Sequence, residues 1–304
     1  MKLFFQGIRS FLFLALVFLI GCAPNYFLFH PLDPAPGIYR ESGFFDQGQL
    51  RTHWLARYPD GREPLPAILV HPDRGSVSSD MEGICFDLAR HGYFAVAVHY
   101  QRLENLEDEN PLIPWRSIEE VRVAFEHLQR NPRVDPARIG VLGFSKGAVL
   151  SLQVASQEPS VKAVVAYYPL ADFDEWMDLS RYSFPKSLIF RWVRSQMVKA
   201  AGAASYAEAQ PRFREMSPLN LADRIKAPVL IIHGEKDLTF PLEQVERLCG
   251  KLKDGGTKCE LMVIPGAGHV FNFIDKEKGR FAWEKTILFL NQYLSPFSEH
   301  KEGP

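Results

Sequence analysis

The fold of this chain is decided by residues 138–148, which read RIGVLGFSKGA. The first half is apolar and rich in branched side chains, as in a buried strand of a parallel sheet, and a helix is expected to begin just after Ser145. Gly143 and Gly147 flank this serine. A serine at a sharp strand-to-helix turn needs small neighbours so that strand and helix can approach closely, and its hydroxyl then stands clear of the sheet. The stretch therefore predicts a nucleophilic serine at a strand end, with its hydroxyl clear of the sheet.

Short apolar runs alternate with helical segments on both sides of this turn. Strands are expected at 67–71, 93–99, 138–144, 161–168, 228–233 and 259–264. Helices are expected at 79–90, 117–129, 146–155, 242–252 and 279–293. Alternating apolar and polar residues at 37–59 predict two antiparallel strands at one edge. The fold class is therefore α/β, with a mostly parallel sheet of about eight strands and helices on both faces.

One segment, residues 171–218, interrupts this alternation and predicts a helical cap insertion. It contains no strand pattern and is dense in aromatic residues, namely Phe173, Trp176, Phe184, Phe190 and Trp192. These side chains either line a pocket for an acyl or aryl group or pack helices over the sheet edge, since both arrangements need the same composition.

Composition indicates one large domain, at residues 37–295, followed by a short tail at 296–304. The chain has 35 basic and 36 acidic residues, a net charge of -1, and no block of like charge. Nucleic acid is therefore excluded as a partner. No spacing resembles a zinc site, so no metal is expected. Cys249 and Cys259 flank a polar turn and either form a disulfide in an oxidising compartment or remain two thiols.

The N-terminus reads as an export signal. Lys2 and Arg9 precede the apolar run 11–20, which is shorter than the roughly 20 residues of a membrane-spanning helix. The run ends in LIGC at 19–22, which resembles the lipobox of bacterial lipoproteins. That resemblance implies cleavage after residue 21, lipidation of Cys22 and a tether at 22–36. The expected location is the cell envelope, anchored to a membrane, and the outer membrane in two-membraned bacteria because Ala23 follows the cysteine.

Histidine and acid partners for Ser145 follow from chain order. In hydrolases with such an elbow the order is nucleophile, acid, histidine. His269 follows an apolar run and the loop PGAG at 265–268, whereas His233 ends a strand and is interpreted as structural. Asp237 comes just past the strand before it, and Glu235 is the runner-up. The predicted catalytic residues are Ser145, Asp237 and His269.

Two backbone N–H groups are expected to stabilise the oxyanion that forms on the substrate. One belongs to Lys146, at the start of the helix. The other comes from the loop after an early strand, HPDRG at 71–75. Pro72 has no N–H, which leaves Asp73 as the candidate, with Arg74 as the alternative.

Beyond these residues, the phrases VDPARIG at 134–140 and APVLIIHG at 227–234 resemble the dienelactone hydrolase-like branch of the α/β-hydrolases, which is related to prolyl oligopeptidase-type domains. The resemblance spans most of 65–294. It implies the α/β-hydrolase fold and catalysis without a cofactor. Dienelactone hydrolases proper have a cysteine where this chain has Ser145, and SKG at 145–147 is similar to acyl-CoA thioesterase and acyltransferase relatives.

The function expected from these features is two-step acyl transfer by a serine hydrolase, with a small-molecule carboxylic ester as substrate. The alternatives are an S9-like peptidase, an acyl-thioesterase, or a lipoprotein that keeps the hydrolase fold as a binding module without turnover. The sequence does not determine the oligomeric state.

Overall fold

A computed structural model describes residues 36–47, 50–61, 64–73, 78–98 and 117–294 of the chain. The expected signal peptide, Cys22, nearly all of the tether and the tail lie outside the described residues, as does Arg74. Within the described residues, no helix is long and apolar enough to cross a membrane, and no three metal-binding side chains cluster.

An eight-stranded sheet forms the centre of the molecule, in the order β1-β2-β4-β3-β5-β6-β7-β8. The strands are β1 Ile38–Gln47, β2 Leu50–Pro59, β3 Leu65–His71, β4 Phe94–Val98, β5 Val134–Phe144, β6 Val161–Tyr167, β7 Val229–Gly234 and β8 Cys259–Ile264. The strands from β4 to β8 run parallel, while β2 pairs antiparallel with both β4 and β1. The expected antiparallel edge and parallel centre are both present.

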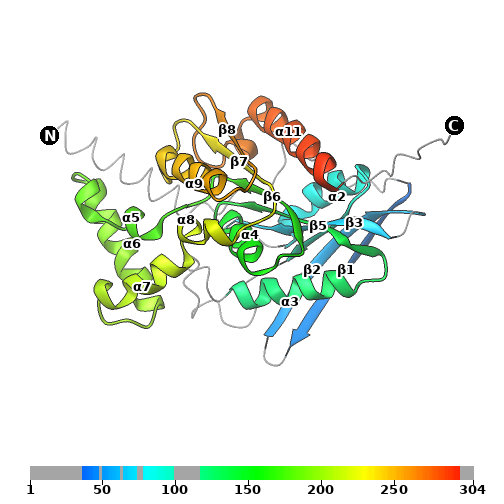
Figure 1. Cartoon of the computed structure of the whole chain (residues 1–304), viewed down its shortest axis with the longest axis horizontal. Helices are drawn as coiled ribbons and strands as arrows, with labels where there is room; N and C mark the ends of the chain where they lie inside the picture. The colour runs from blue at the N-terminus through cyan, green and yellow to red at the C-terminus, as the bar shows by residue number, and fades with distance from the viewer. Residues whose placement is uncertain (1–35, 48–49, 62–63, 74–77, 99–116, 295–304) are drawn as a thin grey trace.

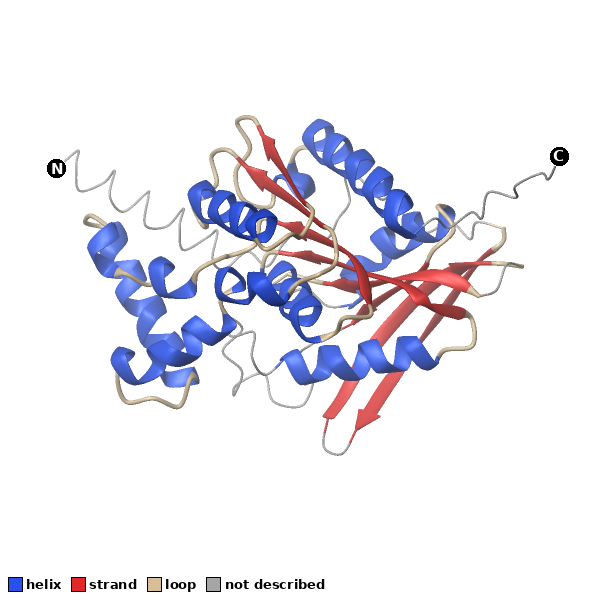
Figure 2. Cartoon of the chain, viewed as in Figure 1, coloured by secondary structure: helices blue, strands red, loops and turns tan. Residues whose placement is uncertain are grey.

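Helices cover both faces of this sheet, as Figures 1 and 2 show. They are η1 Ser78–Met81, α2 Glu82–Arg90, α3 Ser117–Arg130, α4 Lys146–Gln157, α9 Leu242–Asp254, α10 Phe271–Ile274 and α11 Lys276–Leu294. Most bounds agree with the sequence expectation to within a few residues. Helix α11 begins before Gly279 because the Asp275 carboxylate accepts a hydrogen bond from the Lys278 N–H, at 3.1 Å, and caps the first turn.

Two apolar cores result from the alternation of side chains along the central strands. In β3, Ala67 and Leu69 belong to the core that α3, α4 and α9 cover. Ile68 and Val70 point the other way and belong to the core beneath α2 and α11. All seven residues of β3 are buried, and all but His71 are apolar. This is the pattern of a parallel strand that has helices packed on both of its faces.

The insertion at 171–218, called the helical insertion below, is helical as expected and forms a lobe at the end of the molecule opposite to β1 (Figure 1). Its helices are α5 Phe173–Trp176, η2 Leu179–Arg181, α6 Lys186–Ala200 and α7 Tyr206–Met216, and the short α8 Pro218–Leu221 and η3 Ala222–Arg224 lead to β7. A third apolar cluster holds the lobe together. The expected aromatic residues divide, since Phe173, Trp176 and Phe190 are buried while Phe184 and Trp192 are exposed.

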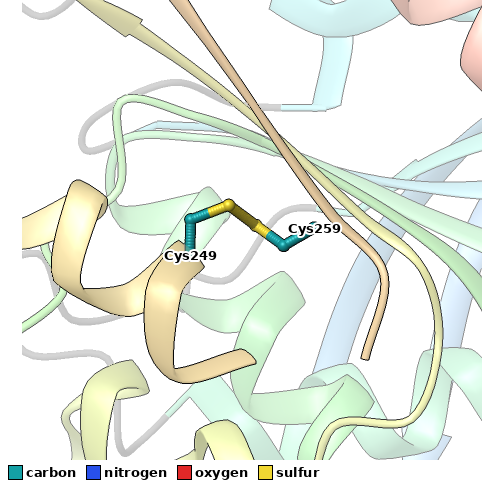
Figure 3. The surroundings of a disulfide bond; sticks show 2 residues. All are labelled: Cys249 and Cys259. Atoms are coloured by element: carbon teal, nitrogen blue, oxygen red, sulfur yellow. A yellow bond between two sulfur atoms is a disulfide. The ribbon is translucent and has the colours of Figure 1, made fainter. Parts of the chain in front are cut away.

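Cys249 and Cys259 are joined by a disulfide, with Cα atoms 5.5 Å apart (Figure 3). The bridge connects α9 to the first residue of β8. Of the two alternatives left by the sequence, the structure contains the bonded one. Cys85 is a free thiol on the buried face of α2, as its position among apolar residues indicates.

Candidate active site

Ser145 lies at the turn between β5 and α4, in a backbone conformation that L-residues rarely adopt, with φ 51° and ψ −113°. A Cβ on Gly143 would lie 2.1 Å from the carbonyl oxygen of Gly147, so only glycine permits the strand and the helix to approach this closely. The expected strand-to-helix turn is therefore present, and the serine is its strained residue.

The loop after β3 closes directly on the start of α4. A Cβ on Gly147 would lie 2.2 Å from the carbonyl oxygen of His71 and 2.4 Å from that of Pro72. Asp73 follows Pro72 and is buried, and Lys146 is the first residue of α4. Both residues expected to supply oxyanion donors thus belong to segments that meet beside Ser145.

The structure brings Ser145, His269 and Asp237 together from the ends of three strands. The Oγ atom of Ser145 lies 3.1 Å from Nε2 of His269. On the other side of the ring, Nδ1 lies 2.7 Å from Oδ2 of Asp237. The Asp237 side chain is fully buried, whereas that of His269 is 13% exposed. This arrangement lets the imidazole accept the serine proton while the carboxylate stabilises the resulting charge.

Hydrogen bonds hold the Asp237 carboxylate in place. Its Oδ1 atom accepts from the N–H groups of Thr239 at 2.8 Å and Phe240 at 3.0 Å. Burial alone would raise the pKa of Asp237, but the electrostatic interaction and hydrogen bond with His269, the electrostatic interaction with His233 and the backbone donor outweigh burial and hold that pKa below its ordinary value. Asp237 is therefore ionised at neutral pH and retains Oδ2 for His269.

His233 has the structural position that its strand end indicates. It is fully buried, and its Nε2 atom lies 3.0 Å from the carbonyl oxygen of Phe240, to which it can donate. Burial is the main cause that lowers the pKa of His233, so the ring is neutral. Its Nε2 also lies 3.6 Å from Oδ2 of Asp237, a proximity that the sequence did not indicate. His233 thus supports the loop that carries the carboxylate.

Glu235, the runner-up acid, points elsewhere. Its Oε2 atom accepts a hydrogen bond from the N–H of Gly266 at 2.7 Å. A Cβ on Gly234 would lie 2.5 Å from the carbonyl oxygen of Ala267, so the loops after β7 and β8 pack tightly on one another. The role of Glu235 is therefore to hold the loop that leads to His269.

Two aromatic rings, those of Tyr168 and Phe240, enclose His269, and no motif in the sequence indicates either. Tyr168 lies edge-on at 4.6 Å between ring centroids and Phe240 at 5.0 Å. Tyr168 follows β6 and, like Ser145 and Val270, has a positive φ. Tertiary contacts hold a residue other than glycine in this left-handed conformation, and one of them is the hydrogen bond from the Tyr168 hydroxyl to Asn272, at 2.8 Å. Contacts between residues so far apart in the chain cannot be recognised from the sequence pattern.

Comparisons with known proteins show the family of the chain. Residues 54–294 match the dienelactone hydrolase family. The chain belongs to the dienelactone hydrolase family. A probable 2-oxo-3-(5-oxofuran-2-ylidene)propanoate lactonase from a Bradyrhizobium species is 22% identical over 262 residues, which cover 81% of this chain and 91% of that protein.

Solved structures share the fold at low sequence identity. A putative dienelactone hydrolase from Klebsiella pneumoniae has a TM-score of 0.63 and 19% identity, with 84% of this chain and 99% of that chain covered. An acylaminoacyl peptidase from Pyrococcus horikoshii has a TM-score of 0.70 and 19% identity, with 88% of this chain but only 43% of that chain covered. The eight-stranded sheet is that of the α/β-hydrolase fold, and the family supports assignment of the chain as a hydrolase and an enzyme.

Proposed function

We propose that this hydrolase is a serine esterase that acts through an acyl-enzyme, with Ser145 as nucleophile, His269 as general base and Asp237 as its acid partner. The observation that supports the proposal most strongly is the continuous chain of contacts from Ser145 Oγ through the His269 ring to Asp237 Oδ2, at 3.1 and 2.7 Å. A serine hydroxyl is a weak nucleophile at neutral pH, and the His269 imidazole is the base that activates it.

In the first step, Nε2 of His269 takes the hydroxyl proton as Ser145 attacks the ester carbonyl. The negative charge that develops on the carbonyl oxygen is stabilised by the backbone N–H groups of Lys146 and Asp73. The imidazolium then donates its proton to the departing alcohol, and an acyl-serine forms. Water attacks this ester in the second step, with His269 again as base, and releases the carboxylic acid.

Support for the oxyanion residues comes from the contact of Gly147 with the loop at His71 and Pro72. The start of α4 also directs the positive end of the helix dipole to this position. The Asp73 side chain must face away from the oxyanion, because a second negative charge there would oppose the developing one.

An ester is the preferred substrate class because the aromatic surroundings of His269 suit an apolar acyl or aryl group. Phe240 contacts both His269 and Trp176 of the helical insertion, with ring centroids 5.0 and 5.5 Å apart. The insertion is therefore continuous with one wall of the site. The Bradyrhizobium relative is named as a probable lactonase, and a lactone is a cyclic ester opened by the same chemistry.

The test is steady-state hydrolysis of short- and medium-chain p-nitrophenyl esters by the chain from Ala23 onward, beside Ser145→Ala. We expect the variant to lose about 10³-fold to 10⁶-fold in kcat and to keep the wild-type melting temperature. Thioester and aminoacyl-amide substrates run in parallel distinguish a thioesterase or peptidase. Equal, negligible rates for both chains on all three substrate classes would contradict the proposed esterase activity and favour a binding module.

The second part of the proposal is that the mature protein is a lipoprotein of the bacterial cell envelope, anchored through Cys22 and outer-membrane-bound in two-membraned bacteria. The LIGC stretch at 19–22 supports this assignment. The Cys249–Cys259 disulfide is also typical of an oxidising compartment. Metabolic labelling with a fatty acid analogue should mark the wild-type chain and leave Cys22→Ala unlabelled. Labelling of both chains would refute the anchor at this cysteine.

A further inference from the structure

The outward side of the helical insertion exposes large apolar side chains. Phe184 is 79% exposed, Leu188 49% and Trp192 58%. Leu188 and Trp192 are one turn apart on α6 and therefore share a face. The opposite face of the helix is buried in the lobe through Phe190, Val193 and Met197. A helix with one apolar face in a core and a second apolar face in solvent requires an explanation.

Positive charge accompanies these apolar residues. Helix α6 reads KSLIFRWVRSQMVKA and contains four basic residues and no acidic one. Arg191 and Lys199 are exposed, and Arg194 stacks on the Tyr206 ring at 4.7 Å. Among the residues that the structure describes, none forms an ion pair with Arg191, Arg194 or Lys199. The outward side of α6 is thus both apolar and cationic.

A surface hollow lies beside the exposed apolar and basic side chains of α6. It has a volume of about 380 Å³, lies between the second half of α6 and the start of α7, and is lined by the basic side chains of Arg191, Arg194 and Lys199. The one carboxylate at the start of α7, that of Glu208, already accepts a hydrogen bond from the N–H of Ala204 at 2.8 Å. The hollow therefore offers cationic groups and enough room for a phosphate-sized anion.

The first turn of α6 contacts the loop that carries Asp237. The Nζ atom of Lys186 donates to the carbonyl oxygen of Leu238, at 3.2 Å. Leu238 follows Asp237 directly and is itself 76% exposed. The apolar and cationic surface of α6 and of the segment just before it, called the outer face below, is defined by Phe184, Leu188, Arg191, Trp192 and Lys199. It begins next to the active-site loop.

We propose that the outer face binds the surface of an anionic phospholipid bilayer. Its apolar side chains enter the boundary between headgroups and acyl chains, where tryptophan and phenylalanine are favoured. Its arginine and lysine lie at the level of the lipid phosphates. The binding is separate from the proposed hydrolysis and does not require it.

Vesicle sedimentation tests this proposal with the unlipidated chain from Ala23 onward, which contains the complete sheet and all three apolar clusters. The probes are vesicles of phosphatidylcholine alone and of phosphatidylcholine with phosphatidylglycerol. We expect binding to the mixed vesicles and at least about tenfold weaker binding for the double variant Phe184→Ser with Trp192→Ala. We expect Arg191→Gln with Lys199→Gln to weaken binding to the mixed vesicles about tenfold and to leave the weak binding to neutral vesicles unchanged.

Matched controls remove equivalent groups elsewhere. Phe281 and Leu288 on α11 are 59% and 66% exposed, and Lys253 and Lys276 are exposed lysines. The control variants are Phe281→Ala with Leu288→Ala, and Lys253→Gln with Lys276→Gln. Both should bind vesicles as the wild type does. Hydrolysis of a soluble ester should be the same in all these variants, so a failure of the proposed esterase activity and a failure of membrane binding would be distinguished.

Three results would overturn the proposal. One is the absence of wild-type binding to mixed vesicles, and another is equal binding by the outer-face and control variants. The third is a wild-type dimer in sedimentation velocity that the outer-face variants convert to monomer, because a second copy of the chain would then be the occupant of this surface.

Discussion

The strand-end site and the helical insertion are both rich in aromatic residues, but they use them differently. Around His269, the rings of Tyr168 and Phe240 both contact the imidazole. The Tyr168 hydroxyl also donates to Asn272, and the backbone carbonyl of Phe240 accepts from His233. In the insertion, Trp176 is 3% exposed and Trp192 is 58% exposed, although both belong to helices of the same lobe. In the site, contacts with particular neighbours therefore determine where each aromatic ring lies. In the insertion, the aromatic composition indicates only that helices form, and not which rings are buried.

The largest effect should come from the carboxylate of the site. Asp237→Asn keeps an Oδ1 acceptor for Thr239 and Phe240 but places an amide donor beside Nδ1 of His269, which favours the wrong tautomer. We expect kcat for ester hydrolysis to fall by about 10⁴-fold. Glu235→Gln is the matched control and should change kcat less than about threefold, because Glu235 contacts only loop backbone. The reverse order of effects would transfer the acid role to Glu235.

Two tryptophans of the helical insertion, one buried and one exposed, should differ in their contribution to stability. Trp176 packs on Phe190 and Phe240 and donates to the carbonyl oxygen of Thr239 at 2.9 Å. We expect Trp176→Ala to lower the free energy of unfolding by about 3–5 kcal/mol. Trp192→Ala should change it by less than about 0.5 kcal/mol. Urea denaturation measures both, and similar losses for the two would show that exposure does not separate their roles.

Removal of the disulfide probes the support behind the site. The bridge closes a loop with a sequence separation of 10 between α9 and β8, and β8 leads to the loop of His269. Cys249→Ala with Cys259→Ala should lower the free energy of unfolding by about 3 kcal/mol. Ester hydrolysis at 25 °C should remain, since the triad contacts do not involve either sulfur. A thermal melt and an activity assay on the same preparation check both expectations, and unchanged stability would contradict the first.

Acid should destabilise the sheet through its buried histidines. Burial lowers the pKa of His71 from 6.5 to about 3. Below pH 6.5 the unfolded chain binds a proton that folded His71 does not, so stability is fully present above this pH and decreases as the pH falls. The loss should reach roughly 2–3 kcal/mol at pH 4.5 from this residue alone. His71→Asn should flatten the denaturation profile over that range, and an unchanged slope would exclude His71 as the cause.

Much of the site could be predicted because its determinants are local. Gly143 and Gly147 are needed by the turn itself, and chain order then selects Asp237 and His269. The positive φ of Tyr168 and Val270 could not be predicted, since neither residue type favours it and long-range contacts impose it. The exposure of Trp192 could not be predicted either, because α6 has apolar residues on both faces and the helical period alone does not show which face packs on the core.

The left-handed backbone at Ser145, Tyr168 and Val270 has a consequence for laboratory evolution. Glycine adopts such a conformation without strain, so glycine at position 145 would relieve roughly 1 kcal/mol and abolish the nucleophile. Selection of a mutant library for heat tolerance alone would therefore favour inactive chains at this position. Selection that also demands turnover would keep the strained serine and would have to find its stabilising substitutions elsewhere in the chain.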